Sequence, residues 1–272
     1  QALLATMAGF YAVYHGPEGI RTIAGRIHSI AAFLEQEINK LGYRQMNAQY
    51  FDTLRFALPD NVSAQQVRTV ALSKEVNLRY FKNGDVGMSI DETTDLAAVN
   101  VLLSIFGIAA GKDYTKAADI PESCTIAEAF RRQSAYLTHE VFNKYHTETE
   151  MMRYIKRLDR KDISLAHSMI SLGSCTMKLN AAAEMLPLSR PEFMGIHPLV
   201  PEDQAEGYRE LIHNLSEELK VITGFAGVSL QPNSGAAGEY AGLRVIRAYQ
   251  ESIGQGHRNK VLIPASAHGT NP

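Results

Sequence analysis

The stretch from residue 228 to residue 267 constrains the fold most, because it has the order strand, turn, helix, strand. The apolar triplet VSL precedes the small-residue turn QPNSGAAG, the amphipathic segment EYAGLRVIRAYQESI and the apolar run KVLIPASA. Strands that are joined through a helix pair in parallel. We therefore predict that a parallel sheet covered by helices begins here.

The turn after the first of these strands consists of residues with little or no side chain, from Ser234 to Gly238. Backbone N–H groups at a helix N-terminus can approach an oxyanion closely in such a turn, and the helix dipole favours negative charge there. No Gly-Lys-Ser/Thr or G-x-G-x-x-G pattern is present, so the turn indicates a cradle for one phosphate. An ordinary turn whose small residues serve packing is the alternative.

The first third of the chain predicts a separate α+β unit. Apolar residues recur at helical spacing from Pro17 to Leu41, and Gly42 follows as a stop. The segment DTLRFAL alternates as a half-buried strand does. Ser63, with Gln66 three residues later, forms a capping box for a helix to about Val76.

A hairpin and a helix are predicted to complete this unit. Asn83-Gly84 within NLRYFKNGDVGMSID is the dipeptide favoured in tight hairpins. Thr93 or Thr94 is expected to cap the next helix, which should end at Gly107. The residues expected to face inward from this helix are Leu96, Val99, Leu103 and Phe106. The unit should therefore contain an antiparallel sheet.

The middle of the chain predicts a linker followed by helices. Residues 108–135 lose apolar periodicity, which indicates a linker or a surface crossing. The polar segment THEVFNKYHTETEMMRYIKRLDRKD is expected to be helical, with Thr147 or Thr149 near its cap. His139 and His146 could then share a helix face, but no third ligand is evident and no metal site is predicted. Farther on, DQAEGYRELIHNLSEELKVITG has one apolar helical face.

Composition excludes several classes of function. The 272 residues are 45% hydrophobic, enough for one core or two, and the net charge of -2 indicates neither nucleic acid nor an anionic membrane as partner. Two cysteines exclude a disulfide framework and favour a reducing compartment. We find no membrane-spanning run and no signal or transit peptide. The chain starts at Gln1 within a helical pattern and stops at Pro272 soon after a strand, so we expect a piece of a longer polypeptide.

Two further stretches carry polar groups that suit a ligand site. The segment SLGSCTMKLN contains four small polar residues, Ser171, Ser174, Cys175 and Thr176. They suggest a substrate-lining loop, but no His is placed to activate the thiol, and Lys178 is expected to be solvated. His268 follows a predicted strand at its carboxyl end, with Thr270 nearby, where ligands bind in open α/β sheets. A surface position for this His is the alternative.

Five stretches together resemble one family: MAGFYAVYHGPEGI, HTETEMMRYI, SLGSCTMKLNAAAEM, QPNSGAAGEYAGL and IPASAHGTNP. They look like glycine decarboxylase, the P-protein of the glycine cleavage system. The resemblance implies an incomplete portion of an α/β and α+β fold of the pyridoxal-phosphate-dependent transferase-like (aspartate aminotransferase) type. Residues 1–107 would end a first half with a small α+β domain, 108–163 would be a linker with crossing helices, and 164–272 would start the second half's cofactor-binding domain.

The resemblance also implies roles for individual residues. Ser234, Gly235 and Ala236 would hold the 5′-phosphate of pyridoxal phosphate, and His268 would stack on the pyridine ring with Thr270 close by. The candidates for lining the substrate site are Ser174, Cys175, Thr176 and His197. The family's Schiff-base lysine would lie beyond residue 272, so no catalytic residue is assigned here. The chain alone is therefore expected to be inactive and to lack the cofactor.

For the intact enzyme, the resemblance implies decarboxylation of glycine and transfer of the aminomethyl group to the lipoyl arm of the H-protein. It implies a homodimer or a two-half heterotetramer, cytoplasmic in a bacterium or in the mitochondrial matrix of a eukaryote. Two alternatives stay open. One is another pyridoxal-phosphate enzyme, an aminotransferase or a decarboxylase. The other is a non-catalytic interaction module in which residues 1–107 mediate dimerisation.

Overall fold

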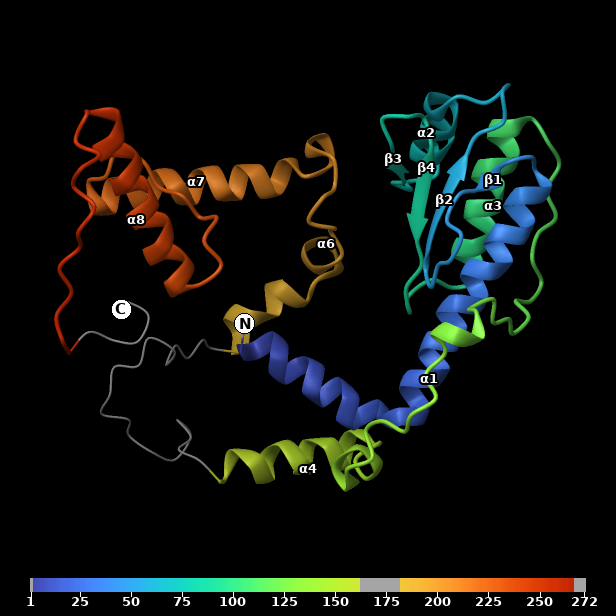
Figure 1. Ribbon diagram of the computed structural model, residues 1–272, viewed down its shortest axis with the longest axis horizontal. Helices are drawn as coiled ribbons and strands as arrows, with labels where there is room; N and C mark the ends of the chain where they lie inside the picture. The colour runs from blue at the N-terminus through green and yellow to red at the C-terminus, as the bar shows by residue number, and fades with distance from the viewer. Residues whose placement is uncertain (1, 162–181, 267–272) are drawn as a thin grey trace. The chain divides into compact units, whose positions relative to one another are not determined.

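The computed structural model describes residues 2–161 and 182–266, which fall into two units (Figure 1). The N-terminal unit lies within residues 2–164 and the C-terminal unit within residues 165–272. A sheet forms in the N-terminal unit, whereas the described part of the C-terminal unit is helical. Within the two described ranges, no helix combines the length and the apolar character needed to cross a membrane.

The N-terminal unit begins with α1 (Ala2–Lys40), which is kinked at Gly16. The backbone of Gly16 has φ 62° and ψ -178°, a conformation that is essentially restricted to glycine. The helix predicted from Pro17 onward is confirmed, and Gly42, with φ 97°, follows its end as expected. The residues that α1 buries at helical spacing are Ile27, Ile30, Leu34 and Ile38.

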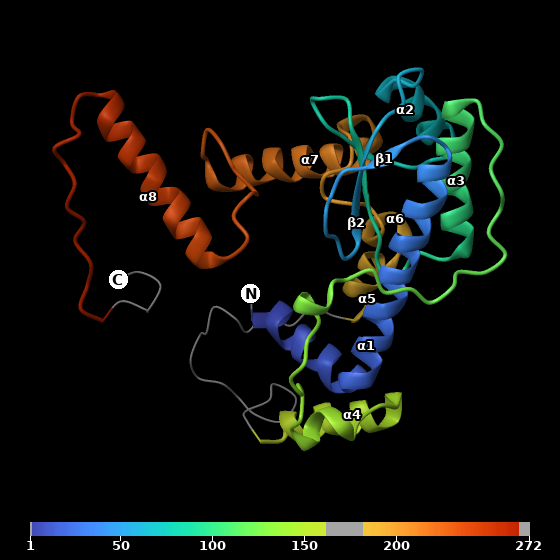
Figure 2. The same ribbon diagram turned by 45° about the vertical axis from the view of Figure 1, so that its right-hand side comes forward.

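A four-stranded antiparallel sheet follows in the order β1-β2-β4-β3. Its strands are β1 (Arg44–Gln45), β2 (Thr53–Ala57), β3 (Arg79–Tyr80) and β4 (Val86–Ser89). The predicted strand and the hairpin at Gly84 are both confirmed. Leu54 and Phe56 of β2 are fully buried beneath α1 and α3 (Leu96–Ala110), which lie side by side (Figures 1 and 2).

Helix α2 (Ala64–Ser73) confirms the predicted capping box. The Ser63 hydroxyl accepts the Gln66 N–H at 3.2 Å, and the Gln66 side chain accepts the Ser63 N–H at 2.7 Å. The predicted end near Val76 was too far along the chain. Glu75 adopts φ 59°, which a continuing right-handed helix does not allow.

The start and the end of α3 differ from prediction. Asp95, and not Thr93 or Thr94, is the N-cap, because its carboxylate accepts the Ala98 N–H at 2.8 Å. Both threonine hydroxyls instead donate to Asp91, and the hydrogen bond from the Thr93 side chain lowers the pKa of that carboxyl. The helix also runs past the predicted stop at Gly107.

Gly111, with φ 63°, is the left-handed residue that ends α3, so the earlier glycine is helical. A Cβ on Gly107 would lie 2.7 Å from the Tyr114 ring, which accounts for glycine there by packing and not by helix termination. Leu96 was wrongly expected to face inward, since it is 36% exposed at the first turn. The other predicted inward residues, Val99, Leu103 and Phe106, are buried.

We expect the Asp95→Ala substitution to lower the stability of α3 by about 1 kcal/mol, the usual cost of removing an N-cap. Amide hydrogen exchange in residues 96–100 measures this change. Glu92→Ala is the control, because the structure gives the Glu92 side chain no capping role and only its carbonyl accepts a hydrogen bond, from Arg26. Equal protection losses in the two variants would contradict the assignment of Asp95 as the cap.

The segment after α3 is irregular, as predicted, but it is tied to the core. His28, only 2% exposed, lies between Phe51 and Thr125. Its Nε2 accepts the Thr125 N–H at 3.0 Å, so Nδ1 carries the proton and donates to the Phe51 carbonyl at 2.8 Å. The imidazole therefore joins α1 to two segments that are distant in sequence.

Two short 3₁₀ helices and α4 (Glu148–Asp159) complete the described part of this unit. The 3₁₀ helices are η1 (Glu128–Phe130) and η2 (Glu140–Asn143), and Thr147 caps α4 as one of the two expected residues. The prediction that His139 and His146 share a helix face is wrong. His139 accepts the Val141 N–H at the start of η2, whereas His146 lies in the following loop and its ring contacts the Tyr14 carbonyl at 2.7 Å.

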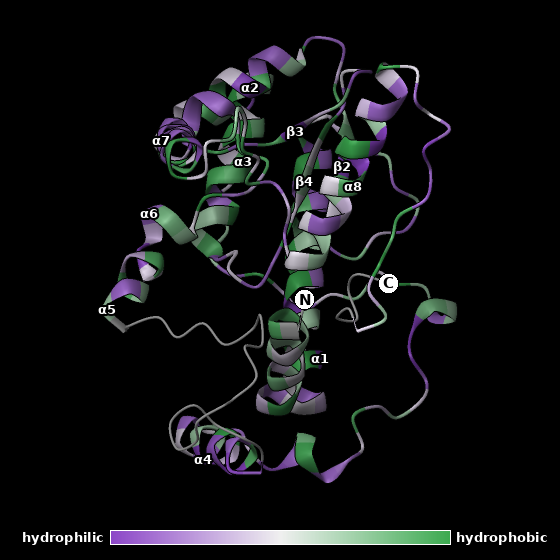
Figure 3. Ribbon diagram, turned by 90° about the vertical axis from the view of Figure 1, so that its left-hand side faces the viewer, coloured by the Kyte–Doolittle hydropathy of each residue, from purple (hydrophilic) through white to green (hydrophobic). Residues whose placement is uncertain are grey.

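The described part of the C-terminal unit contains two long helices, α7 (Glu206–Thr223) and α8 (Gly235–Ser252), both as predicted. Shorter elements precede them: α5 (Ala182–Met185), η3 (Leu186–Ser189), α6 (Pro191–Met194) and η4 (Glu202–Gln204). Gly224, with φ 73°, ends α7. Figure 3 shows hydrophobic and hydrophilic residues mixed along α8.

The strands predicted at residues 228–230 and 260–266 are absent from the described structure. A strand is completed by hydrogen bonds to a neighbour, and neither segment has a paired neighbour within residues 182–266. No residue in 183–266 is buried, and Leu262 in the second segment is 98% exposed. The prediction that a parallel sheet begins here is therefore wrong for residues 228–266.

Candidate functional site

The predicted phosphate cradle lies at the N-terminus of α8. Ser234 is the N-cap, with extended backbone at φ -157° and ψ 168°. Its hydroxyl accepts the Ala237 N–H at 3.2 Å, and its carbonyl accepts the Gly238 N–H at 2.9 Å. This local pair of hydrogen bonds fixes where the helix begins.

The capping arrangement leaves two N–H groups directed out of the helix. In an α-helix the first N–H groups have no acceptor within the helix, and here these belong to Gly235 and Ala236. A Cβ built on Gly235 would meet no atom within 4 Å, so an anion can approach the backbone at this point. Ser234, Gly235 and Ala236 are all exposed.

The electrostatics of this helix end suit an anion. The first turn of α8 contains no acidic residue that would compete for the N–H groups. The helix has 18 residues, so the aligned peptide dipoles place partial positive charge at Gly235 and Ala236. Donors of this kind fit a phosphate group, and we find no feature of the three residues that conflicts with one.

The other predicted site residues are not joined to this helix end by any described contact. His197 is exposed and lies in a tight turn, where its Nδ1 accepts the Leu199 N–H at 3.0 Å. No hydrogen bond or ring contact within residues 182–266 links it to Ser234. The candidates that lie outside the described residues are Ser174, Cys175, Thr176, His268 and Thr270.

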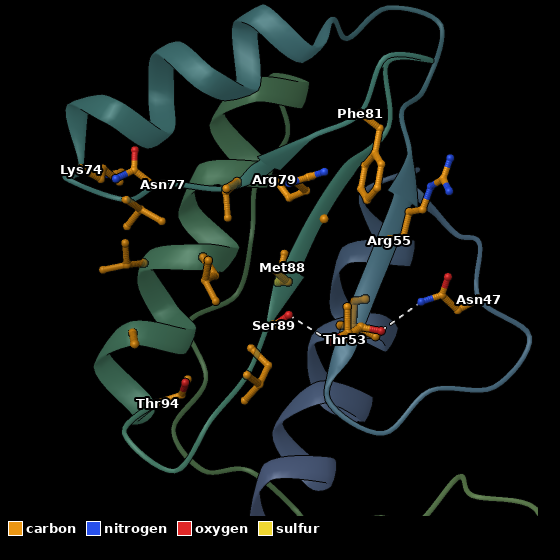
Figure 4. A pocket seen from close by; sticks show the side chains of 18 residues that line it. Asn47, Thr53, Arg55, Lys74, Asn77, Arg79, Phe81, Met88, Ser89 and Thr94 are labelled. Atoms are coloured by element: carbon orange, nitrogen blue, oxygen red, sulfur yellow. Dashed lines mark hydrogen bonds between the residues drawn. The ribbon is translucent and has the colours of Figure 1, made fainter. Parts of the chain in front are cut away.

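A cavity in the N-terminal unit was not predicted from the sequence. It has a volume of about 700 Å³ and lies between β4, α3 and the segment that joins α2 to β3 (Figure 4). Its walls come from four separate parts of the chain, so no local motif could have indicated it. Within residues 2–161 and 182–266, no cluster of three or more metal-ligating side chains forms.

Comparison with known proteins gives one family. Residues 1–106 match the sequence model described as the glycine cleavage system P-protein. The whole chain is 82% identical to the glycine dehydrogenase (decarboxylating) of Bacteroides thetaiotaomicron and 84% identical to that of Bacteroides fragilis. The protein of the same name from Flavobacterium johnsoniae is 52% identical over 272 residues.

These matches cover all of this chain but only part of each relative. The chain spans 29% of the length of the two Bacteroides proteins and 28% of the Flavobacterium protein. The alignments extend across both units, including residues 107–272, which lie beyond the match to the family model. The chain is therefore similar to the glycine cleavage system P-protein over residues 1–106 and to glycine dehydrogenases (decarboxylating) over its whole length, and it corresponds to less than a third of these relatives.

Proposed function

We propose that the protein represented by this chain is a glycine dehydrogenase (decarboxylating). The observation that carries this proposal is the 82–84% identity to relatives of that name over all 272 residues. The reaction would release carbon dioxide from glycine and pass the aminomethyl group to a lipoylated H-protein. The assembly would be a homodimer or a two-half heterotetramer, and the bacterial relatives favour the cytoplasm over the mitochondrial matrix.

Pyridoxal phosphate is the proposed cofactor, and bound to the enzyme it would supply an electron sink for the carbanion formed on decarboxylation. Ser234, Gly235 and Ala236 would hold its 5′-phosphate through one hydroxyl and two backbone N–H groups. The exposed, acid-free N-terminus of α8 supports this assignment. His268 and Thr270 would lie at the ring, and the substrate side would be lined by Ser174, Cys175, Thr176 and His197.

The residues of this chain would bind and orient the cofactor without making a covalent bond to it. The covalent lysine would lie in the family's sequence beyond the position of Pro272. Residues 1–107 would be the end of the first half, residues 108–163 the linker, and residues 164–272 the start of the cofactor-binding domain. The aspartate aminotransferase fold type is part of this proposal.

The test is the Ser234→Asp substitution in the intact protein. Aspartate is as good an N-cap as serine, so α8 should keep its start. Its carboxylate would, however, lie beside the cofactor's phosphate, and two negative charges at hydrogen-bonding distance repel. We expect pyridoxal phosphate to bind at least about tenfold more weakly, equivalent to about 1.4 kcal/mol, as measured by absorbance titration.

Ser252→Asp is the matched control, because it makes the same change at the other end of α8. We expect its cofactor affinity to stay within about twofold of the unsubstituted protein. Equal weakening in both variants would contradict the phosphate assignment. A normal cofactor affinity without glycine-dependent release of carbon dioxide in the unsubstituted protein would contradict the proposed reaction and favour another pyridoxal-phosphate enzyme.

A further inference from the structure

The cavity in the N-terminal unit arises where the sheet is left incomplete. β3 pairs with β4 only through Arg79↔Gly87 and Tyr80↔Val86, whereas β2 pairs with β4 as far as Ser89. Past Gly87, the segment from α2 to β3 therefore diverges from β4. Figure 4 shows the side chains of Lys74, Asn77 and Arg79 along this segment, across the opening from Ser89 and Thr94.

The interior of the cavity is apolar. Met88 and Leu102 are 7% and 8% exposed, so a ligand there would contact side chains that already belong to the core. The apolar lining residues are Leu54, Val76, Leu78, Phe81, Met88, Ile90, Ala98, Val101 and Leu102. A volume of about 700 Å³ falls within the range of sites that bind small organic molecules.

The charged groups of the cavity are all positive. Three cations line it, Lys74, Arg79 and Arg55, and none of its 18 lining residues is Asp or Glu. Arg55 is already neutralised, because its Nε lies 2.7 Å from the carboxylate of Asp85, which is not a lining residue. Hydrogen bonding from Asn83, together with Arg55, lowers the pKa of Asp85, so this pair is ionised at neutral pH.

Lys74 and Arg79 differ from Arg55, because neither forms an ion pair with any of the described residues. The guanidinium of Arg79 lies 5.6 Å from the centre of the Phe81 ring, and both residues line the cavity. Two uncompensated cations beside an apolar interior complement a molecule with one anionic end and one apolar end. A bare anion such as phosphate would leave the apolar walls unused.

We propose that this cavity binds a small amphipathic carboxylate, with its apolar chain against Met88 and Leu102 and its carboxylate at Arg79 and Lys74. A peptide strand is a poorer occupant. Strand addition requires a continuous free edge, and β4 offers only Met88 and Ser89 beyond its pairing with β3. The residues that line this cavity belong to the N-terminal unit, whereas the residues proposed to hold the cofactor's phosphate belong to the C-terminal unit.

Octanoate is the probe, and the methyl resonance of Met88 in the full chain with labelled methionine methyl groups is the reporter. We expect octanoate to shift this resonance saturably. Octanol, which has the same chain without the charge, should bind at least about tenfold more weakly, and acetate, which has no chain, should produce no shift. Met46, which is 44% exposed and outside the cavity, reports non-specific binding.

Two substitutions test the two halves of the site. Arg79→Gln should weaken octanoate binding at least about fivefold, whereas Lys82→Gln, on the same hairpin but outside the lining, should change it less than about twofold. Ala98→Leu should block the chain, because leucine would occupy the apolar interior and is, after alanine, among the best helix formers. Hydrogen exchange of β2 would verify that each variant is folded.

Several outcomes would overturn the proposal. Equal binding of octanol and octanoate would show that the cations play no part. Equal weakening of octanoate binding by Arg79→Gln and Lys82→Gln would show that only the general surface charge attracts the carboxylate. Absence of a saturable Met88 shift, or an equal shift at Met46, would show that the cavity is not a site for this class of molecule.

Discussion

Replacing Phe56 with alanine is expected to destabilise the N-terminal unit by about 3–5 kcal/mol, the range for truncating a buried aromatic residue. Phe56 is fully buried on β2, which pairs with strands on both sides. Its ring centre lies 5.7 Å from that of Phe106, which in turn lies 4.9 Å from Tyr43. The Tyr43 hydroxyl donates to the Phe106 carbonyl at 2.9 Å, so the neighbours are held in place and cannot close the void.

Hydrogen exchange of amides in β2 and α3 measures this loss, because these amides exchange by opening of the core. Phe130→Ala is the matched control. The Phe130 side chain is 71% exposed in η1, so its removal should change the opening free energy by less than about 0.5 kcal/mol. Similar losses in the two variants would mean that the sheet and α3 do not form the common core described above.

Replacing Gly16 with alanine is expected to cost about 2–4 kcal/mol, from backbone strain and steric overlap together. The conformation at φ 62° and ψ -178° is unfavourable for any residue with a Cβ. A Cβ there would also lie 2.6 Å from the Phe142 carbonyl oxygen and 2.8 Å from the His146 ring. The first contact is with backbone, which a rotamer change cannot relieve.

Gly9→Ala supplies a control with the opposite sign. Gly9 lies in α1 before the kink, and a Cβ there would meet no atom within 4 Å. Alanine is favoured over glycine in a helix by about 0.5–1 kcal/mol, so this variant should be slightly stabilised. Hydrogen exchange in residues 140–159 and thermal unfolding would compare the two. Loss of stability in both variants would contradict the special role of Gly16.

Sequence patterns predicted the N-terminal unit well where the structural signal was local. The strand around Leu54 and Phe56, the capping box at Ser63 and the hairpin at Gly84 each depend on a few adjacent residues. Prediction failed where several adjacent residues could serve the same purpose. Thr93, Thr94 and Asp95 are all good N-caps, and only the competing hydrogen bonds to Asp91 decide among them.

The strands expected on either side of α8 show a second limit of prediction from sequence. An apolar triplet or quartet indicates that a segment suits a sheet, but not that a neighbour is available to pair with it. The candidate site was likewise predictable only where it depends on adjacent residues. Ser234, Gly235 and Ala236 form a recognisable local pattern, whereas no pattern places His197 near them, and the cavity at Arg79 depends on four segments that meet only in the folded unit.

The cap of α8 has a consequence for the order in which a binding site could be assembled. Every hydrogen bond that shapes it joins residues no more than four apart, from Ser234 to Gly238. The donors for an anion can therefore acquire their geometry as soon as the helix forms, before any strand pairs. Distant parts of the polypeptide would then have to determine only where these donors point. Substitutions far from the turn should consequently change the orientation of a bound anion more than the strength of its binding.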